Sequence, residues 1–293
     1  MKHSKVKDSI YISFIEIALQ VVSLIPPYSS KFSKKTYTQQ QLLVLLILKQ
    51  KLKLSYETLI EDLKTRPNII LLIGLTKLPS PSTLKMFTKR IKSSLLEKLI
   101  GKTISFTKKK KLKLGVDATG FHIEDGSFYY RKRVGLSSKT RKNVKLSAAI
   151  ETDKQLVIAT KIRKSTAHDN IDFKPLVKKA SKIKQIKIVV SDKGYDDETN
   201  HKFVVEKLKA ECIIPPRNYG ERTKHNAYSY RNKLKKKYSK KKYHQRSKVE
   251  TVFSVIKRLF GAVLYAKKWL MQKKELLFKI LAYNIYRLTK LRI

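Results

Sequence analysis

Apolar residues in the N-terminal third of the chain recur at the spacing of amphipathic helices. The pattern predicts a helix over residues 9–25, because apolar side chains return every three or four positions until Pro26 and Pro27 interrupt it. Further short helices follow in quick succession, with capping sequences at Thr38 with Gln41, at Ser55, and at Ser80 or Ser82. Residues 1–107 are therefore expected to form a small all-α domain.

From residue 108 onward the pattern becomes that of strands alternating with helices. Leu112, Leu114 and Val116 predict a strand that runs directly into Asp117, and an apolar run at 186–190 predicts a buried parallel strand followed by Asp192. The remaining segments are strands at 127–133, 145–150, 156–162 and 212–216, and helices after Asp169, at 198–209 and over 243–257. This order is that of an α/β fold, an RNase H-like mixed sheet flanked by helices, so residues 108–293 are expected to form that domain.

The charge of the chain is extreme, with 67 Lys and Arg against 22 Asp and Glu, a formal net charge of +45. A compact state with this charge repels itself unless a polyanion accompanies it, and nucleic acid is the natural partner. The basic residues spread along the chain and are not confined to one amphipathic anchor, which argues against a membrane partner. The segment 222–248 holds twelve Lys or Arg and no acid, and we expect it to contact the DNA backbone.

Cysteine usage and the N-terminal apolar segment indicate the compartment. Cys212 is the single cysteine, so an intrachain disulfide and a cysteine-based zinc site are excluded. The segment from Ile10 to Ile25 contains Glu16 and Gln20, which suits a packed helix better than a membrane span of about 20 apolar residues. We expect a cytoplasmic protein.

The stretch YHQRSKVETVFSVIK, residues 243–257, combines an apolar face with a polar stripe. At about 100° per residue, Tyr243, Arg246, Glu250 and Lys257 fall within roughly 60° of one another on a continuous helix. Taken by itself, the stripe is a surface helix with an Arg246–Glu250 ion pair worth a few tenths of a kcal/mol. The spacing of the four residues adds more information.

The four residues have the spacing of the Y-R-E-K signature: two residues separate Tyr from Arg, three separate Arg from Glu, and six separate Glu from Lys. The stretch resembles the bacterial and archaeal insertion-sequence transposases that carry this signature. These are DDE transposases with an RNase H-like catalytic core. The resemblance implies that Glu250 is the third metal-binding carboxylate, with Asp117 on the first strand and Asp192 after the fourth as its partners. The segment Asp192-Lys193-Gly194-Tyr195 also matches the family, and the resemblance covers roughly residues 110–287.

The resemblance implies an activity and its partners. Three carboxylates would hold two Mg²⁺ or Mn²⁺ ions, which suit an in-line phosphoryl displacement. The reaction would be DNA cleavage and strand transfer at the ends of an insertion sequence, with Tyr243, Arg246 and Lys257 at the phosphates beside the scissile bond. The partners would be double-stranded DNA, as terminal inverted repeats and target, and further copies of the chain in a homodimer or larger assembly. The N-terminal helical domain would contact the terminal repeats.

Two other functions remain open from the residues. An RNase H-like DNA endonuclease needs the same carboxylates without strand transfer, and an inactive lysine-rich DNA-binding protein needs only the charge. Singly, Asp117 is also interpretable as a structural carboxylate beside a turn, and Asp192 as the first residue of an Asx turn. Asp196 and Asp197 have the pattern of turn and cap residues.

Overall fold

The computed structural model describes residues 9–124, 132–133, 135, 143–164, 168–217, 229–236 and 239–292. By backbone contacts the chain divides into two compact units, residues 1–99 with 274–293, and residues 100–273. The predicted division at 107 and 108 placed the last twenty residues with the catalytic domain, whereas by contact they group with the N-terminal helices. Within the described ranges, no helix is long and apolar enough to span a membrane.

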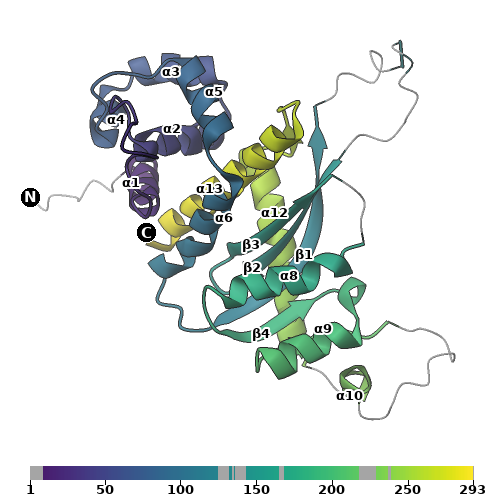
Figure 1. The fold of residues 1–293 in the computed structure, drawn as a ribbon. Helices are drawn as coiled ribbons and strands as arrows, with labels where there is room; N and C mark the ends of the chain where they lie inside the picture. The colour runs from purple at the N-terminus through teal and green to yellow at the C-terminus, as the bar shows by residue number, and fades with distance from the viewer. Residues whose placement is uncertain are drawn as a thin grey trace, which may run out of the picture. The chain divides into compact units, whose positions relative to one another are not determined.

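The first unit is helical, as the sequence pattern predicts (Figure 1). Thr38 and Gln41 form the expected capping box, and Ser55 and Ser80 accept the expected N-cap hydrogen bonds from backbone N–H groups. Its helices are α1 (Ile10–Val22), α2 (Gln39–Leu52), α3 (Tyr56–Lys64), α4 (Pro67–Ile73), α5 (Pro81–Arg90), most of α6 (Ser93–Lys102) and the greater part of α13 (Trp269–Arg292).

The second unit contains one mixed sheet of six strands. The strand order is β3-β2-β1-β4-β5, in which β2 pairs antiparallel with both β1 and β3, while β4 pairs parallel with β1 and β5. The short strand β6 adds to the far end of β1. The bounds are β1 (Leu112–Ile123), β2 (Asn143–Glu151), β3 (Leu156–Arg163), β4 (Ile186–Ser191), β5 (Glu211–Ile213) and β6 (Val263–Leu264). The predicted RNase H-like α/β fold is confirmed by this sheet and the helices that flank it.

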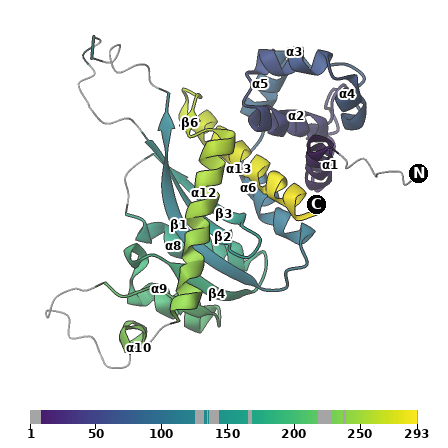
Figure 2. The ribbon, with the colours of Figure 1, turned by 180° about the vertical axis from the view of Figure 1, so that it is seen from behind.

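Helices cover both faces of the sheet. Figures 1 and 2 show α8 (Asn170–Ser181) and α9 (Glu198–Lys202) on one face and α12 (Ser247–Phe260) across the other. Val249, Val252, Phe253, Ile256 and Phe260 of α12 are buried, as the amphipathic pattern predicts.

Two predicted elements differ from the observed ones. The strand expected at 127–133 lies mostly outside the described residues, and its described positions Lys132 and Arg133 are helical. The helix expected over 198–209 is α-helical only in α9 and continues as a π-helical turn at Phe203–Lys207. Three antiparallel strands, β1 to β3, therefore come first in the described sheet.

Candidate active site

Two carboxylates lie at neighbouring positions of two parallel strands. The register pairs Val116 of β1 with Ser191 at the end of β4, so Asp117 and Asp192 come next on adjacent strands. Local backbone groups use one oxygen of each: Asp117 Oδ1 accepts from the Ala118 N–H at 2.8 Å, and Asp192 Oδ1 accepts from the Gly194 N–H at 2.9 Å. The second of these is the Asx turn that the sequence suggests. In both residues Oδ2 remains for another partner.

A close approach of α12 to β1 brings Glu250 beside them. Gly115 makes this approach feasible, because a Cβ added there would lie 2.3 Å from Val249 Cγ2. Glu250 follows Val249 by one residue, on the exposed side of the first turn of α12. The sheet register and one glycine therefore fix the three predicted carboxylates in one place.

Arg246 lies among the three carboxylates. Its Nη1 is 2.8 Å from Glu250 Oε1, 3.7 Å from Asp117 Oδ2 and 4.0 Å from Asp192 Oδ2. One guanidinium nitrogen thus contacts oxygens from two strands and one helix. The helical i, i+4 pair with Glu250 is one part of a four-residue cluster.

The electrostatics of the cluster follow from burial and from this arginine. Burial raises the pKa of the Asp117 carboxyl, and the neighbouring Asp192 and Glu250 raise it further, while the Ala118 N–H and Arg246 oppose them. Burial alone would lower the pKa of Arg246. Its acidic neighbours raise the pKa above the ordinary value, with the largest contribution from Glu250 and smaller ones from Asp117 and Asp192. A cation among these carboxylates stabilises their charged form.

The donor set fits a hard divalent cation. All three side chains supply carboxylate oxygens, the ligands that Mg²⁺ and Mn²⁺ prefer, and one cationic nitrogen already lies between them. In their present positions the three carboxylates are not gathered into a closed metal site, and the described part of the chain contains no group of three or more His, Cys, Asp or Glu side chains placed to hold a metal ion. A cation that contacted all three carboxylates would take the place that Arg246 now occupies.

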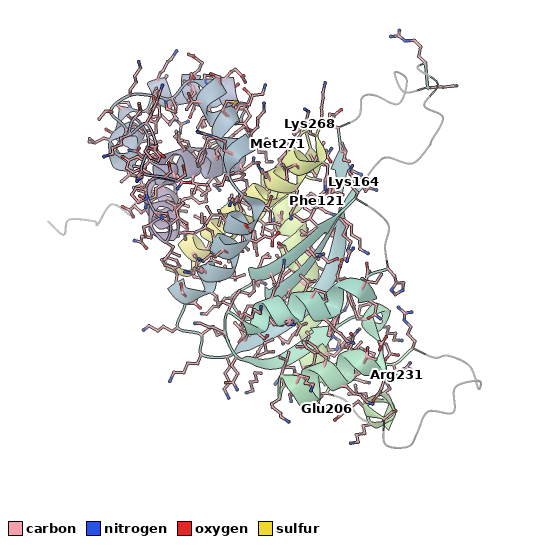
Figure 3. The ribbon with its side chains drawn as sticks, in the orientation of Figure 1. Phe121, Lys164, Glu206, Arg231, Lys268 and Met271 are labelled. Carbon is pink, nitrogen blue, oxygen red and sulfur yellow. The ribbon has the colours of Figure 1, made fainter. Side chains whose placement is uncertain are left out.

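A hollow of about 620 Å³ opens beside Asp117 and Glu250. Lys257 and Arg258 of α12 line it, so carboxylates and cations share one concave surface. Lys257 Nζ donates to Thr119 Oγ1 at 2.7 Å, and lies 5.5 Å from the ring centre of Phe121, which is labelled in Figure 3. Burial lowers the pKa of Lys257.

Tyr243 and Arg246 both precede α12, the helix that carries Glu250 and Lys257. The segment divides into α11 (Lys240–Tyr243), a 3-10 turn at His244–Arg246 and α12, so the expected 100° progression is interrupted before Arg246. The Tyr243 ring packs, partly buried, against an apolar cluster of β4 and β5, namely Ile188, Val190 and Ile213. The continuous helix expected over residues 243–257 is thus interrupted by one 3-10 turn, and Tyr243 remains among the neighbours that raise the pKa of Arg246.

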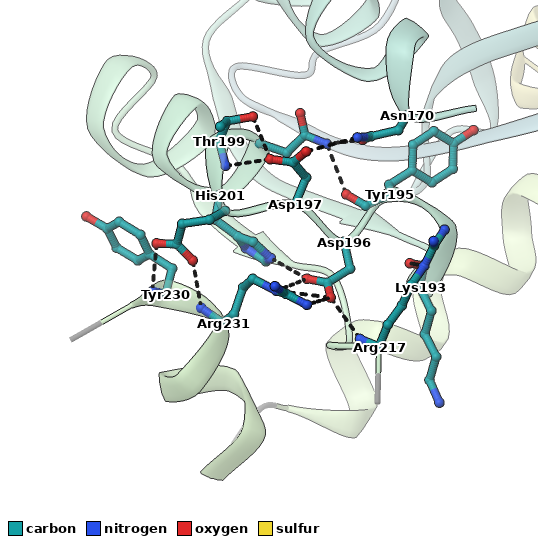
Figure 4. Close-up of polar contacts among 12 residues, drawn as sticks. Asn170, Lys193, Tyr195, Asp196, Asp197, Thr199, His201, Arg217, Tyr230 and Arg231 are labelled. Atoms are coloured by element: carbon teal, nitrogen blue, oxygen red, sulfur yellow. Dashed lines mark hydrogen bonds and ion pairs between the residues drawn. The ribbon is translucent and has the colours of Figure 1, made fainter. Parts of the chain in front are cut away.

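A second polar cluster surrounds Asp196, which the sequence suggested was a turn residue (Figure 4). Its buried carboxylate accepts hydrogen bonds from Arg231 Nε at 2.9 Å, Arg231 Nη2 at 2.5 Å and the Arg217 N–H at 2.8 Å, and His201 Nε2 lies 3.4 Å away. Arg217 also donates to the carbonyls of Lys193 and Gly194 at 2.7 and 2.6 Å. The cluster thereby holds the turn that presents Asp192. Sequence reasoning missed this cluster, although Asp197 caps α9 as expected.

Comparison with known proteins identifies the family of the second unit. A family model described as "Transposase DDE domain" matches residues 108–285. No curated protein matches the chain. Among solved structures, a piggyBac transposase in a synaptic complex with hairpin DNA is similar at a TM-score of 0.48 and 11% identity, over 98% of this chain and 73% of that one.

Proposed function

The chain belongs to the transposase DDE domain family, and from this premise we propose that it cleaves DNA at the ends of an insertion sequence and joins them to target DNA. The observation that carries the proposal is the convergence of Asp117, Asp192 and Glu250 on one cationic nitrogen. Three carboxylates beside a basic hollow suit phosphoryl transfer, in which a cation must offset the charge of both ligands and phosphate.

Asp117, Asp192 and Glu250 are the residues proposed to hold two Mg²⁺ or Mn²⁺ ions. Bound at this site, two such ions would stabilise the attacking and leaving oxygens of an in-line displacement. Asp117 and Asp192 each offer Oδ2, because their other oxygen is engaged by the backbone. The attacking oxygen would be that of water in cleavage and that of the freed 3′-hydroxyl in joining, so the protein supplies no nucleophile.

Cationic side chains around the carboxylates are proposed to hold the DNA. Lys257 lines the same hollow as Asp117 and Glu250, and Thr119 fixes its ammonium by a hydrogen bond. Arg246 is proposed to contact a phosphate once it leaves the carboxylates, where its planar fork suits two phosphate oxygens. For Tyr243 the same role requires its hydroxyl to reach the phosphate while the ring stays packed on β4 and β5.

Each part of the chain has its own role in the proposed function. We assign cleavage and joining to the domain at 108–293, backbone contact to its basic segment 222–248, and terminal-repeat binding to the helical domain at 1–107. Residues 222–228 and 237–238 of the basic segment lie outside the described residues. The resemblance also favours a homodimer or larger assembly on the DNA ends.

The experiment is a cleavage and joining assay with labelled element ends, run with Mg²⁺ and with EDTA. Asp117→Asn and Asp192→Asn should each abolish Mg²⁺-dependent cleavage and leave DNA binding near the wild-type level, because the basic surface remains. Wild-type activity in either variant would overturn the assignment of that carboxylate.

A joining assay with a precut end distinguishes a transposase from an endonuclease without strand transfer. Lys257→Gln should keep metal binding and lose joining by roughly ten- to a hundred-fold, because a charge-assisted phosphate contact contributes about 1.5–3 kcal/mol. Wild-type cleavage without any joining would favour the endonuclease. Absence of both, with DNA binding intact, would favour the lysine-rich binding protein.

A further inference from the structure

A second hollow, of about 450 Å³, lies on the same sheet face as the carboxylates and contains none of them. Lys113 of β1 and Ile188 and Val190 of β4 line it. Lys113 precedes Asp117 by four residues on the same side of β1, which separates the two by about 13 Å. The contact between Gly115 and Val249 lies between these two positions of β1, where α12 crosses the sheet (Figure 2).

The lining is strongly basic. Five lysines surround the hollow, from β1, β4, α11 and α12: Lys113, Lys187, Lys241, Lys242 and Lys248. Two carboxylates also line it and are already used, since Asp153 pairs with Lys113 at 3.2 Å and Glu211 with Lys242 at 2.7 Å. Five ammonium groups less two carboxylates leave a charge of +3. Within the described ranges, Lys187, Lys241 and Lys248 have no ion-pair partner.

The rest of the lining adds an apolar floor and one hydrogen-bond acceptor. Ile188 and Val190 are buried beneath the lysines. Gln245 also lines the hollow, and its Oε1 is buried without a hydrogen-bond partner in the described part of the chain. A simple anion would neutralise the lysines and leave this acceptor unsatisfied. A nucleotide unit carries both an anionic phosphate and amino donors on its base.

We infer that this hollow is a second docking site for a DNA strand, which holds the strand about 13 Å from the carboxylates through its phosphates. The inference rests on the proposed function in that the strand is DNA. Because the lysines contact phosphates, which every sequence carries, binding requires no particular sequence and its strength depends steeply on salt. With Lys113 and Lys187, the proposed DNA contacts include residues of the sheet as well as the basic segment 222–248.

The test replaces two of the three lysines Lys187, Lys241 and Lys248, one from β4 and one from α11, in the double variant Lys187→Gln with Lys241→Gln. The matched control is Lys178→Gln with Lys182→Gln, which removes the same charge from exposed positions in and just after α8 on the opposite face. Affinity for an unrelated DNA duplex is measured in EDTA over a series of salt concentrations. Because each neutralised phosphate contributes about 0.9 to the slope of log K against log salt, two lost contacts should make the slope shallower by about 1.8.

The control double variant should keep the wild-type slope. Equal slopes in the two double variants, or a wild-type affinity that does not depend on salt, would overturn the inference. Mg²⁺-dependent cleavage is measured separately on the wild type. Absence of cleavage together with the predicted difference in slope would reject the proposed function and support the docking site. Cleavage together with equal slopes would support the proposed function and reject the docking site.

Discussion

Arg246 occupies the space between the carboxylates, so its removal should change the affinity of the site for metal. The perturbation is Arg246→Gln, which keeps a polar side chain and removes the positive charge. A divalent cation must displace the arginine from Asp117, Asp192 and Glu250 before it can bind all three, whereas in the variant it meets no competing cation. We therefore expect the variant to bind Mn²⁺ more tightly than the wild type.

The magnitude follows from the exposure of each contact. The Glu250 side chain is 55% exposed and that of Asp192 48% exposed, so each is a surface pair worth about 0.3–0.5 kcal/mol. Asp117 is only 18% exposed, which places its contact near the upper limit for such pairs, about 1 kcal/mol. The contacts together contribute about 1.5–2 kcal/mol, which corresponds to roughly a ten- to thirty-fold gain in Mn²⁺ affinity.

Isothermal titration with Mn²⁺ in the absence of DNA measures this directly. Lys257→Gln is the matched control, because it removes a nearby positive charge that is hydrogen-bonded to Thr119 and that contacts no carboxylate among the described residues. In an Asp117→Asn background the effect of Arg246→Gln should shrink, since the largest contact is already lost. If Arg246→Gln binds Mn²⁺ no more tightly than Lys257→Gln, the arginine does not compete with metal and the reasoning is wrong.

Three further outcomes are expected. Gly115→Ala should lower the free energy of unfolding by about 1–3 kcal/mol and weaken Mn²⁺ binding, because the new methyl group would clash with Val249. In the control Gly120→Ala the nearest atoms are 3.9 Å from the new methyl group, so stability and Mn²⁺ affinity should stay at the wild-type level. Asp196→Asn should cost about 3–5 kcal/mol in denaturant unfolding, because it leaves the Arg231 charge buried without its partner. Burial alone would raise the pKa of Asp196, but hydrogen bonds from His201 and Arg231 lower it below its ordinary value. The charged carboxylate therefore stabilises the fold above the unfolded pKa near 3.9, and this stabilisation is lost as the pH falls through the folded pKa. Between pH 5 and pH 3 the wild type should therefore lose more stability than Asp196→Asn.

Local pattern was sufficient to place the three carboxylates on their elements. An alternating strand predicts the position of Asp117, a continuous apolar run predicts the end of β4 before Asp192, and an amphipathic pattern predicts the helix of Glu250. These are short-range signals with fixed periods, and parallel pairing of β1 with β4 converts them into neighbouring side chains. The fold follows because each element has one face that must be buried.

Tyr243 shows where a periodic pattern ceases to predict. The sequence gives no Pro or Gly between Tyr243 and Arg246, so the pattern is compatible with one straight helix. The structure instead has a 3-10 turn at His244–Arg246, and the Tyr243 ring packs against Ile188 and Val190 of the sheet. Burial of an aromatic ring outweighs the small cost of one tighter turn, and that gain depends on the tertiary neighbours.

The cluster around Asp196 was beyond prediction for a different reason, which is the composition of the chain. With 67 basic residues against 22 acidic ones, each carboxylate has about three cations to choose from, and charge alone does not select a partner. Arg231 is the partner because Asp196 is buried where α10 (Tyr230–Lys236) meets the turn after β4, and an uncompensated carboxylate there would be costly. Arg217 and Arg231 are fourteen positions apart in the sequence, and a single carboxylate holds both. In a chain with so many cations, it is the burial of this one acid that selects Arg217 and Arg231 as its partners.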